Sequence, residues 1–207
     1  MDHLWDKLLK IVGDIFPNEL VQFIFPDQQI KIQGKYEQEK VVIESQIADI
    51  NFWILDQGVK KLLNIEPYSE WKKSIPSRVF TRNGIITKSL KYKHEVISVV
   101  VLLDKKSPTG KHRVSLAGQT MNYFKFPVVN LADVERILKD YPPLAPFVLK
   151  MDRSYKDRVL QTIKGNKILL YVTVLVLNRV GFTKEEALAM TGIKLAPFGR
   201  FSSNVIL

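Results

Sequence analysis

The alternation of apolar and polar side chains between residues 47 and 68 is the strongest structural signal in the sequence. A β-rich run, IADINFWIL, is followed by the turn residues Asp56-Gln57-Gly58 and by a second β-rich run from Val59 to Tyr68. Two such runs around a short turn predict a hairpin. Side chains on a strand repeat every two residues, so this turn can bring Asp49 and Glu66 side by side.

Segments with helical periodicity lie on both sides of this hairpin in the sequence. Apolar residues at helical spacing predict a first helix over residues 4–15 and a second over Glu19–Phe25, with Asn18 as its N-cap, packed together over the sheet. Residues 27–43 contain weaker strand signals that suggest an edge strand. After the hairpin, a helix is predicted from Pro76 to about Lys91.

The next apolar run, Val96–Leu103, is almost continuous, as in a strand buried on both faces. The helix before it makes a crossover connection, which is right-handed if the two strands run parallel. A polar basic loop over 105–113, a strand over 122–129 broken by Pro127, and a short helix over 131–138 capped by Asn130 are predicted to follow.

The segment Tyr141–Pro146 is rich in proline and is the best internal boundary. Helices are predicted beyond it near 152–163, 166–180 and 183–190, the last opened by a Thr183/Glu186 capping box. A plain helical hairpin is favoured over a DNA-reading helix-turn-helix, because a basic recognition face is missing. We therefore predict an α/β domain over residues 1–146, with a mixed central sheet flanked by helices, and a helical extension over 147–207 packed on it.

Composition excludes several classes of protein. The 207 residues contain no cysteine, so disulfides, thiolate zinc sites and cysteine nucleophiles are ruled out. The longest aliphatic run, Ile168–Leu177, has ten residues, about half of what crosses a bilayer, and the N-terminal residues do not resemble an export signal. We expect a cytoplasmic protein with no membrane partner.

Positive charge is concentrated after the hairpin. The net charge is +10, and the segment from Ser69 to Arg113 contains eleven Lys or Arg and three acidic residues, a net +8. A basic field of this kind attracts a phosphate backbone, and a solvated basic helix face explains it equally well.

Asp49 and Glu66 are the candidate chemical groups. Two carboxylates on adjacent strands among apolar neighbours are costly unless a positive charge lies between them. A divalent cation such as Mg²⁺ would supply that charge and would suit phosphodiester hydrolysis. The alternative is that both are solvated edge charges. Glu44 is either a third acidic ligand or a structural charge.

Several segments, in order over roughly residues 1–150, resemble a known family. They are FPNELVQFIFPD, ADINFW around Asp49, LLNIEPYSE around Glu66, IPSRVF around Arg78, EVISVVVLL and FKFPVVNL. Together they resemble the YhgA-like family of recombination-promoting nucleases and transposases, within the PD-(D/E)xK nuclease superfamily. The resemblance implies a restriction-endonuclease-like fold and metal-dependent cleavage of DNA. It also implies that Asp49, Glu66 and the Pro67 carbonyl hold Mg²⁺ or Mn²⁺.

The departure from the family pattern is Tyr68, which stands where the superfamily has Lys and this family commonly has Gln. A phenol can donate a hydrogen bond but carries no positive charge at pH 7. Tyr68 therefore either orients the attacking water in place of Lys or marks a relative that has lost catalysis and binds DNA or a protein.

Arg78 matches the family's arginine and is the first candidate for a phosphate contact, a salt bridge to a site acid being the alternative. Homodimerisation is left open. The candidate DNA-binding residues are Lys72, Lys73, Arg78, Arg82, Lys88 and Lys91.

Overall fold

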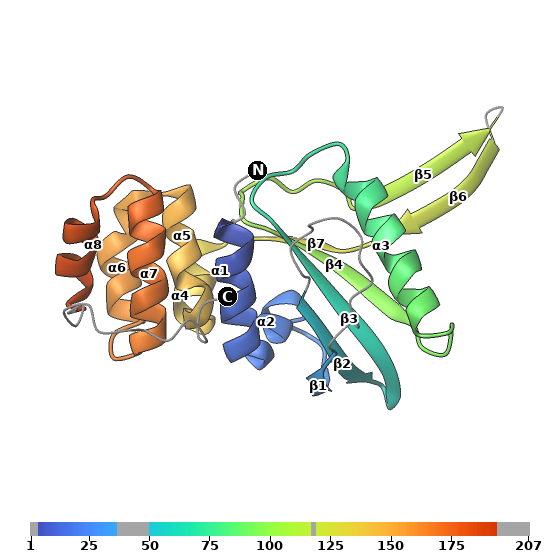
Figure 1. The fold of residues 1–207 in the computed structure, drawn as a ribbon, viewed down its shortest axis with the longest axis horizontal. Helices are drawn as coiled ribbons and strands as arrows, with labels where there is room; N and C mark the ends of the chain where they lie inside the picture. Colours follow the sequence, from blue (N-terminus) through green and yellow to red (C-terminus); the bar gives the residue numbers. More distant parts are fainter. Residues whose placement is uncertain (1–3, 37–49, 117–118, 194–207) are drawn as a thin grey trace.

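The computed structural model describes residues 4–36, 50–116 and 119–193 of the chain, which form an α/β fold with a mixed sheet flanked by helices (Figure 1). The helices are α1 (Leu4–Ile15), α2 (Pro17–Ile24), α3 (Ile75–Ser89), α4 (Val134–Asp140), α5 (Ala145–Met151), α6 (Lys156–Thr162), α7 (Lys167–Arg179) and α8 (Lys184–Thr191), with short 3₁₀ turns η1 (Pro142–Leu144) and η2 (Arg153–Tyr155). The strands are β1 (Lys31–Lys35), β2 (Ile50–Asp56), β3 (Val59–Tyr68), β4 (Val96–Leu102), β5 (Lys111–Leu116), β6 (Gln119–Lys125) and β7 (Val128–Asn130).

The main sheet has five strands in the order β1-β2-β3-β4-β7. The predicted hairpin is confirmed, because β2 and β3 pair antiparallel from Ile50↔Ile65 to Asp56↔Val59. Its two-residue loop, Gln57-Gly58, has positive φ at both positions (49° and 83°), the backbone that a tight hairpin turn requires and that Gly adopts without strain. The crossover through α3 is confirmed as well, since β3 and β4 run parallel.

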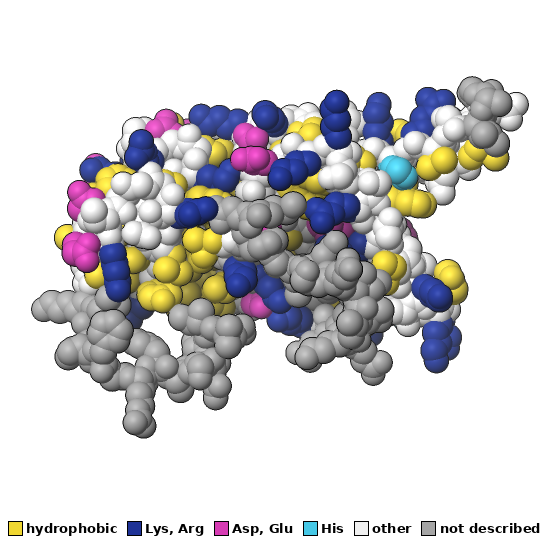
Figure 2. All heavy atoms as spheres, turned by 45° about the horizontal axis from the view of Figure 1, so that its top comes forward, with side chains coloured by type: hydrophobic (Ala, Val, Ile, Leu, Met, Phe, Trp, Pro, Cys, Tyr) yellow, Lys and Arg dark blue, Asp and Glu magenta, His cyan; other side chains and the backbone are white. Residues whose placement is uncertain are grey.

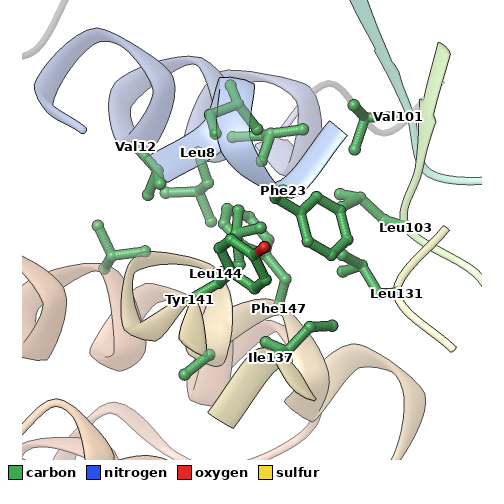
Figure 3. Close-up of a cluster of buried hydrophobic side chains, with 14 of the residues drawn as sticks. Leu8, Val12, Phe23, Val101, Leu103, Leu131, Ile137, Tyr141, Leu144 and Phe147 are labelled. Carbon is green, nitrogen blue, oxygen red and sulfur yellow. The ribbon is translucent and has the colours of Figure 1, made fainter. Parts of the chain in front are cut away.

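The two faces of the sheet differ in chemistry. Odd-numbered residues of β3 such as Leu63 and Ile65 are fully buried in a large apolar cluster with α1, α2 and the helices after residue 130. Figure 3 shows part of this cluster, where Leu8 and Phe23 lie with Leu144 and Phe147. Even-numbered residues of the same strand face the other side, where α3 packs through Ile75 and Val79 against Val100 of β4. This second face therefore carries the polar side chains of β3 under a helix.

The C-terminal helices join the same apolar cluster as the sheet. Leu144 and Phe147, on either side of residue 146, are both fully buried in it. The Lys150 ammonium also donates hydrogen bonds to the carbonyl oxygens of Ser69 (2.8 Å) and Leu103 (2.7 Å), at the ends of β3 and β4. The division of the chain at residue 146 stays a prediction.

Several local predictions need correction. The cap of α2 is Phe16 with Pro17 in the first turn, so Asn18 lies inside the helix. The cap of α4 is Asp133 rather than Asn130, because the Asp133 carboxylate accepts from the Arg136 amide. The predicted basic loop ends where β5 begins at Lys111.

Other details agree with the sequence. β1 is the edge strand, β6 and β7 are separated at Pro127, and the Thr183/Glu186 capping box opens α8. Among the described residues, no helix is both long and apolar enough to cross a bilayer.

Candidate functional site

The polar face of β3 presents three side chains in a row, because Asn64, Glu66 and Tyr68 are two residues apart and so point the same way. Asn51 of β2 is paired with Asn64 and lies on the same face. Above them α3 contributes Arg82. We call Asn51, Asn64, Glu66, Tyr68 and Arg82 the Glu66 cluster.

Three donors hold the Glu66 carboxylate, whose side chain is only 1% exposed. Asn64 Nδ2 donates to Oε1 (3.2 Å), and the Tyr68 hydroxyl donates to Oε2 (2.9 Å). Arg82 Nη1 lies 3.4 Å from Oε2, where it forms a hydrogen bond and an ion pair. A buried carboxylate needs such partners, and here both neighbouring strand positions and the covering helix provide them.

Burial raises the pKa of the Glu66 carboxyl above its ordinary value, because the charged form loses its hydration. The positive charge of Arg82 opposes this rise in pKa, as do the hydrogen bonds from Tyr68 and Asn64 and the more distant charge of Arg78. The net effect is a raised pKa, so the loss of hydration outweighs the partners. A cation placed beside it would favour the charged form.

Burial also raises the pKa of the Tyr68 phenol far above its ordinary value, and the adjacent Glu66 charge and hydrogen bond add to the rise. Tyr68 is therefore a neutral hydrogen-bond donor throughout the range in which proteins stay folded. It cannot act as a general base, and its single proton is directed at Glu66.

Two buried oxygens of the cluster have no hydrogen-bond partner among the described residues. They are the Oδ1 atoms of Asn51 and Asn64, whose side chains are 5% and 0% exposed. The Asn64 amide nitrogen faces Glu66 Oε1, which leaves Asn64 Oδ1 for another donor or a cation. A buried carbonyl oxygen without a partner costs about 1–3 kcal/mol, so a water, a cation or a residue outside the described ranges is expected to supply the missing contact.

The structure places only part of the predicted metal site. Glu66 and Tyr68 are in contact, and Pro67 between them is buried on β3, opposite Val101. Asp49 and Glu44 lie outside the described residues, so the convergence of Asp49 on Glu66 stays a prediction, as does the Pro67 carbonyl as a ligand. Among the described residues, no group of three or more His, Cys, Asp or Glu is arranged to hold a metal ion.

The predicted basic residues fall into two groups. Arg82 contacts Glu66, and Arg78, one helical turn earlier, affects it through charge alone. The salt bridge to Glu66 is therefore made by Arg82, and a salt bridge from Arg78 to Asp49 or Glu44 stays a prediction, because both acids lie outside the described residues. Figure 2 shows Lys and Arg side chains spread along this side of the molecule rather than gathered in one patch. The remaining four predicted residues are exposed: Lys72, Lys73, Lys88 and Lys91.

Sequence reasoning missed Asn51 and Asn64. A signal was present, because Asn64 stands two positions before Glu66 and Asn51 two positions after Asp49, the spacing that puts side chains on one face. Comparison with known proteins gave no match to a family model, to a curated protein or to a solved structure.

Proposed function

We propose that this chain is a metal-dependent DNA endonuclease and that the Glu66 cluster is its centre. The observation that supports the proposal most is the buried Glu66 carboxylate on the same face of the sheet as two buried amide oxygens, Asn51 Oδ1 and Asn64 Oδ1, that have no partner among the described residues. The family resemblance and its restriction-endonuclease-like fold belong to the same proposal.

The donor set suits a hard divalent cation. Mg²⁺ and Mn²⁺ prefer carboxylate and carbonyl oxygens. Among the described residues, Glu66 Oε1 receives one hydrogen bond, from Asn64, although a carboxylate oxygen can accept two. Glu66, with Asp49 and the Pro67 carbonyl, would hold the ion. When bound, it would polarise the phosphate and lower the pKa of a water.

Arg82 accounts for the unusual residue at position 68. The resembled families have Lys or Gln where this chain has Tyr68, which brings no positive charge. In this chain Arg82 brings a guanidinium to within 3.4 Å of Glu66 from the covering helix. We assign to Arg82, with Arg78 beside it, the charge that balances the phosphate, and to Tyr68 the task of holding the carboxylate in place. The Tyr68 oxygen can still accept a hydrogen bond from water.

A second candidate is an inactive relative that binds DNA or a protein through this face. The observation in its favour is that Glu66 Oε2 already has both a hydrogen bond from Tyr68 and an ion pair with Arg82. In that case the negative charge is balanced within the protein and a metal is not needed.

Plasmid nicking in Mg²⁺ or Mn²⁺ separates the two candidates. The nuclease is expected to nick as wild type and to lose activity in Asp49→Ala and in Glu66→Gln. Glu70→Gln removes the same charge from an exposed position four residues along and should cleave like wild type. Activity that appears only in Tyr68→Gln would identify the inactive relative. Equal activity in wild type and Glu66→Gln would refute the proposed centre.

A further inference from the structure

The ribbon formed by β5 and β6 is the feature of the fold that the Glu66 cluster leaves unexplained. Within the part of the chain that the structure describes, the two strands pair only with each other, in a separate sheet, and they extend away from the body of the molecule (Figure 1). An isolated two-stranded ribbon is marginally stable in water, and its outer residues are exposed on both faces. Packing of the core therefore does not explain why this ribbon projects from the molecule. We call residues 111–116 and 119–125 the arm.

The root of the arm is held firmly against α3. The ring of Phe80 stacks on His112 with centroids 4.9 Å apart and meets Phe124 at 5.7 Å. A side chain at Gly110 would collide with the Phe126 carbonyl oxygen, so the chain passes very close to itself at this point. These contacts fix the direction of the arm relative to the helix that carries Arg82.

One face of the arm is basic and aromatic. The pairs Lys111↔Lys125 and Arg113↔Tyr123 are cross-strand neighbours two residues apart, so all four side chains lie on the face opposite His112 and Phe124. The three basic residues are exposed, and Tyr123 is 52% exposed. The segment from 105 to 125 contains five Lys or Arg and no Asp or Glu.

We propose that the arm binds duplex DNA by entering the major groove with this basic face. Paired strands lie about 4.8 Å apart, so a two-stranded ribbon with its side chains fits a groove about 12 Å wide and is too broad for one about 6 Å wide. The arm is about 20 Å long, which exceeds the groove depth of about 8.5 Å. Lys111, Arg113 and Lys125 would neutralise flanking phosphates, while Tyr123 would meet base edges or sugars.

The positive charge of the arm favours DNA over a second copy of the chain as its binding partner. The free edges of β5 and β6 could pair with another arm, and like charges would then be brought together on adjacent strands. A polyanion such as DNA would instead reduce the repulsion among these basic side chains. This inference rests on the proposed function for the choice of DNA, while binding by the arm is separable from cleavage.

The test is fluorescence anisotropy with a labelled mixed-sequence duplex of about 20 base pairs, in EDTA so that no metal-dependent cleavage takes place. The triple variant Lys111→Gln/Arg113→Gln/Lys125→Gln should weaken binding at least about tenfold at 0.1 M salt. The slope of log affinity against log salt should fall by about 2.7, because each phosphate contact contributes about 0.9. The matched control, Lys139→Gln/Lys164→Gln/Lys184→Gln, removes the same charge from exposed positions in the C-terminal helical region and should bind like wild type.

Further measurements identify the groove and separate this inference from the nuclease. A major-groove ligand such as methyl green should compete with the protein and netropsin, which occupies the minor groove, should not. Duplex binding is measured in EDTA and does not require cleavage, so failure of cleavage alone leaves the arm's role standing. Four results would each overturn the inference. Both triple variants could lose the same affinity for the duplex, or the arm variant could lose the same affinity for single-stranded DNA. Netropsin alone could compete with the protein, or wild type could fail to bind the duplex. Because all six positions are exposed, unchanged far-UV circular dichroism should accompany both variants.

Discussion

Replacement of Arg82 by Met tests the electrostatics of the Glu66 cluster. Arg82 Nη1 lies 3.4 Å from the almost fully buried Glu66 carboxylate, and the Arg82 side chain is itself only 22% exposed. Breaking a buried pair by removing one partner typically costs 3–5 kcal/mol. Here the carboxyl can instead take up a proton, which limits the cost. Starting from the ordinary pKa of 4.5, protonation at pH 7 costs about 3.4 kcal/mol, and at pH 5 about 0.7 kcal/mol.

The sign of the pH dependence follows from the raised pKa of Glu66. When the folded-state pKa of a carboxyl is raised, its contribution to the free energy of unfolding is fully present below the unfolded-state pKa of 4.5. That contribution is lost as the pH rises through the folded-state pKa. Arg82→Met raises that pKa further, so the decline continues to higher pH.

Urea denaturation of wild type, Arg82→Met, Glu66→Gln and the double variant gives the coupling free energy between Arg82 and Glu66. We expect about 1–3 kcal/mol at pH 7 and at most about 0.7 kcal/mol at pH 5. The cycle cancels whatever else Arg82 contacts. Coupling of the same size at both pH values would refute the argument that a buried ionised carboxylate is being balanced.

Two further substitutions test the contacts around the cluster. Tyr68→Phe deletes the 2.9 Å hydrogen bond to Glu66 and should lower the free energy of unfolding by about 1.5–3 kcal/mol at pH 7. Urea denaturation measures this change, and an unchanged free energy of unfolding would mean that the bond does not form. Lys150→Met removes the donor to the Ser69 and Leu103 carbonyls and should lower the melting temperature by several degrees. Lys164→Met, at an exposed position, should not, and equal melting temperatures for both variants would contradict a structural tie between α5 and the sheet.

The central sheet was predictable because its sequence pattern is local. The β2–β3 hairpin follows from period-two alternation and from Gly58, which adopts without strain the positive φ that the turn requires. The apolar run of β4 indicates burial on both faces, and the helix before it requires a crossover. These features depend on neighbours in the sequence.

β5 and α5 were not predicted, for different reasons. Side chains on both faces of the outer arm are exposed, so no apolar alternation marks β5 as a strand, and only the part of β6 from residue 122 onward fell within the strand predicted over 122–129. The prolines from 142 to 146 suggest a boundary, although Pro is well tolerated in the first turn of a helix and α5 begins there.

The candidate site was predictable only in part. Glu66 is noticeable as an acid in an apolar strand, whereas Asn51 and Asn64 are residues more typical of turns. The choice between Arg78 and Arg82 depends on how α3 is rotated over the sheet. That rotation is set by the contacts of Ile75 and Val79 with β4, which no local pattern specifies.

The central claim is that Glu66 holds a divalent cation, and Mn²⁺ binding followed by electron paramagnetic resonance tests it most directly. Wild type and the matched surface variant Glu70→Gln should bind one Mn²⁺ per chain with equal affinity, and Glu66→Gln should lose that binding at least about tenfold. Mg²⁺ should displace the bound Mn²⁺, since both ions use oxygen ligands. Equal Mn²⁺ affinity in wild type and Glu66→Gln, or no bound Mn²⁺ in wild type, would contradict the claim.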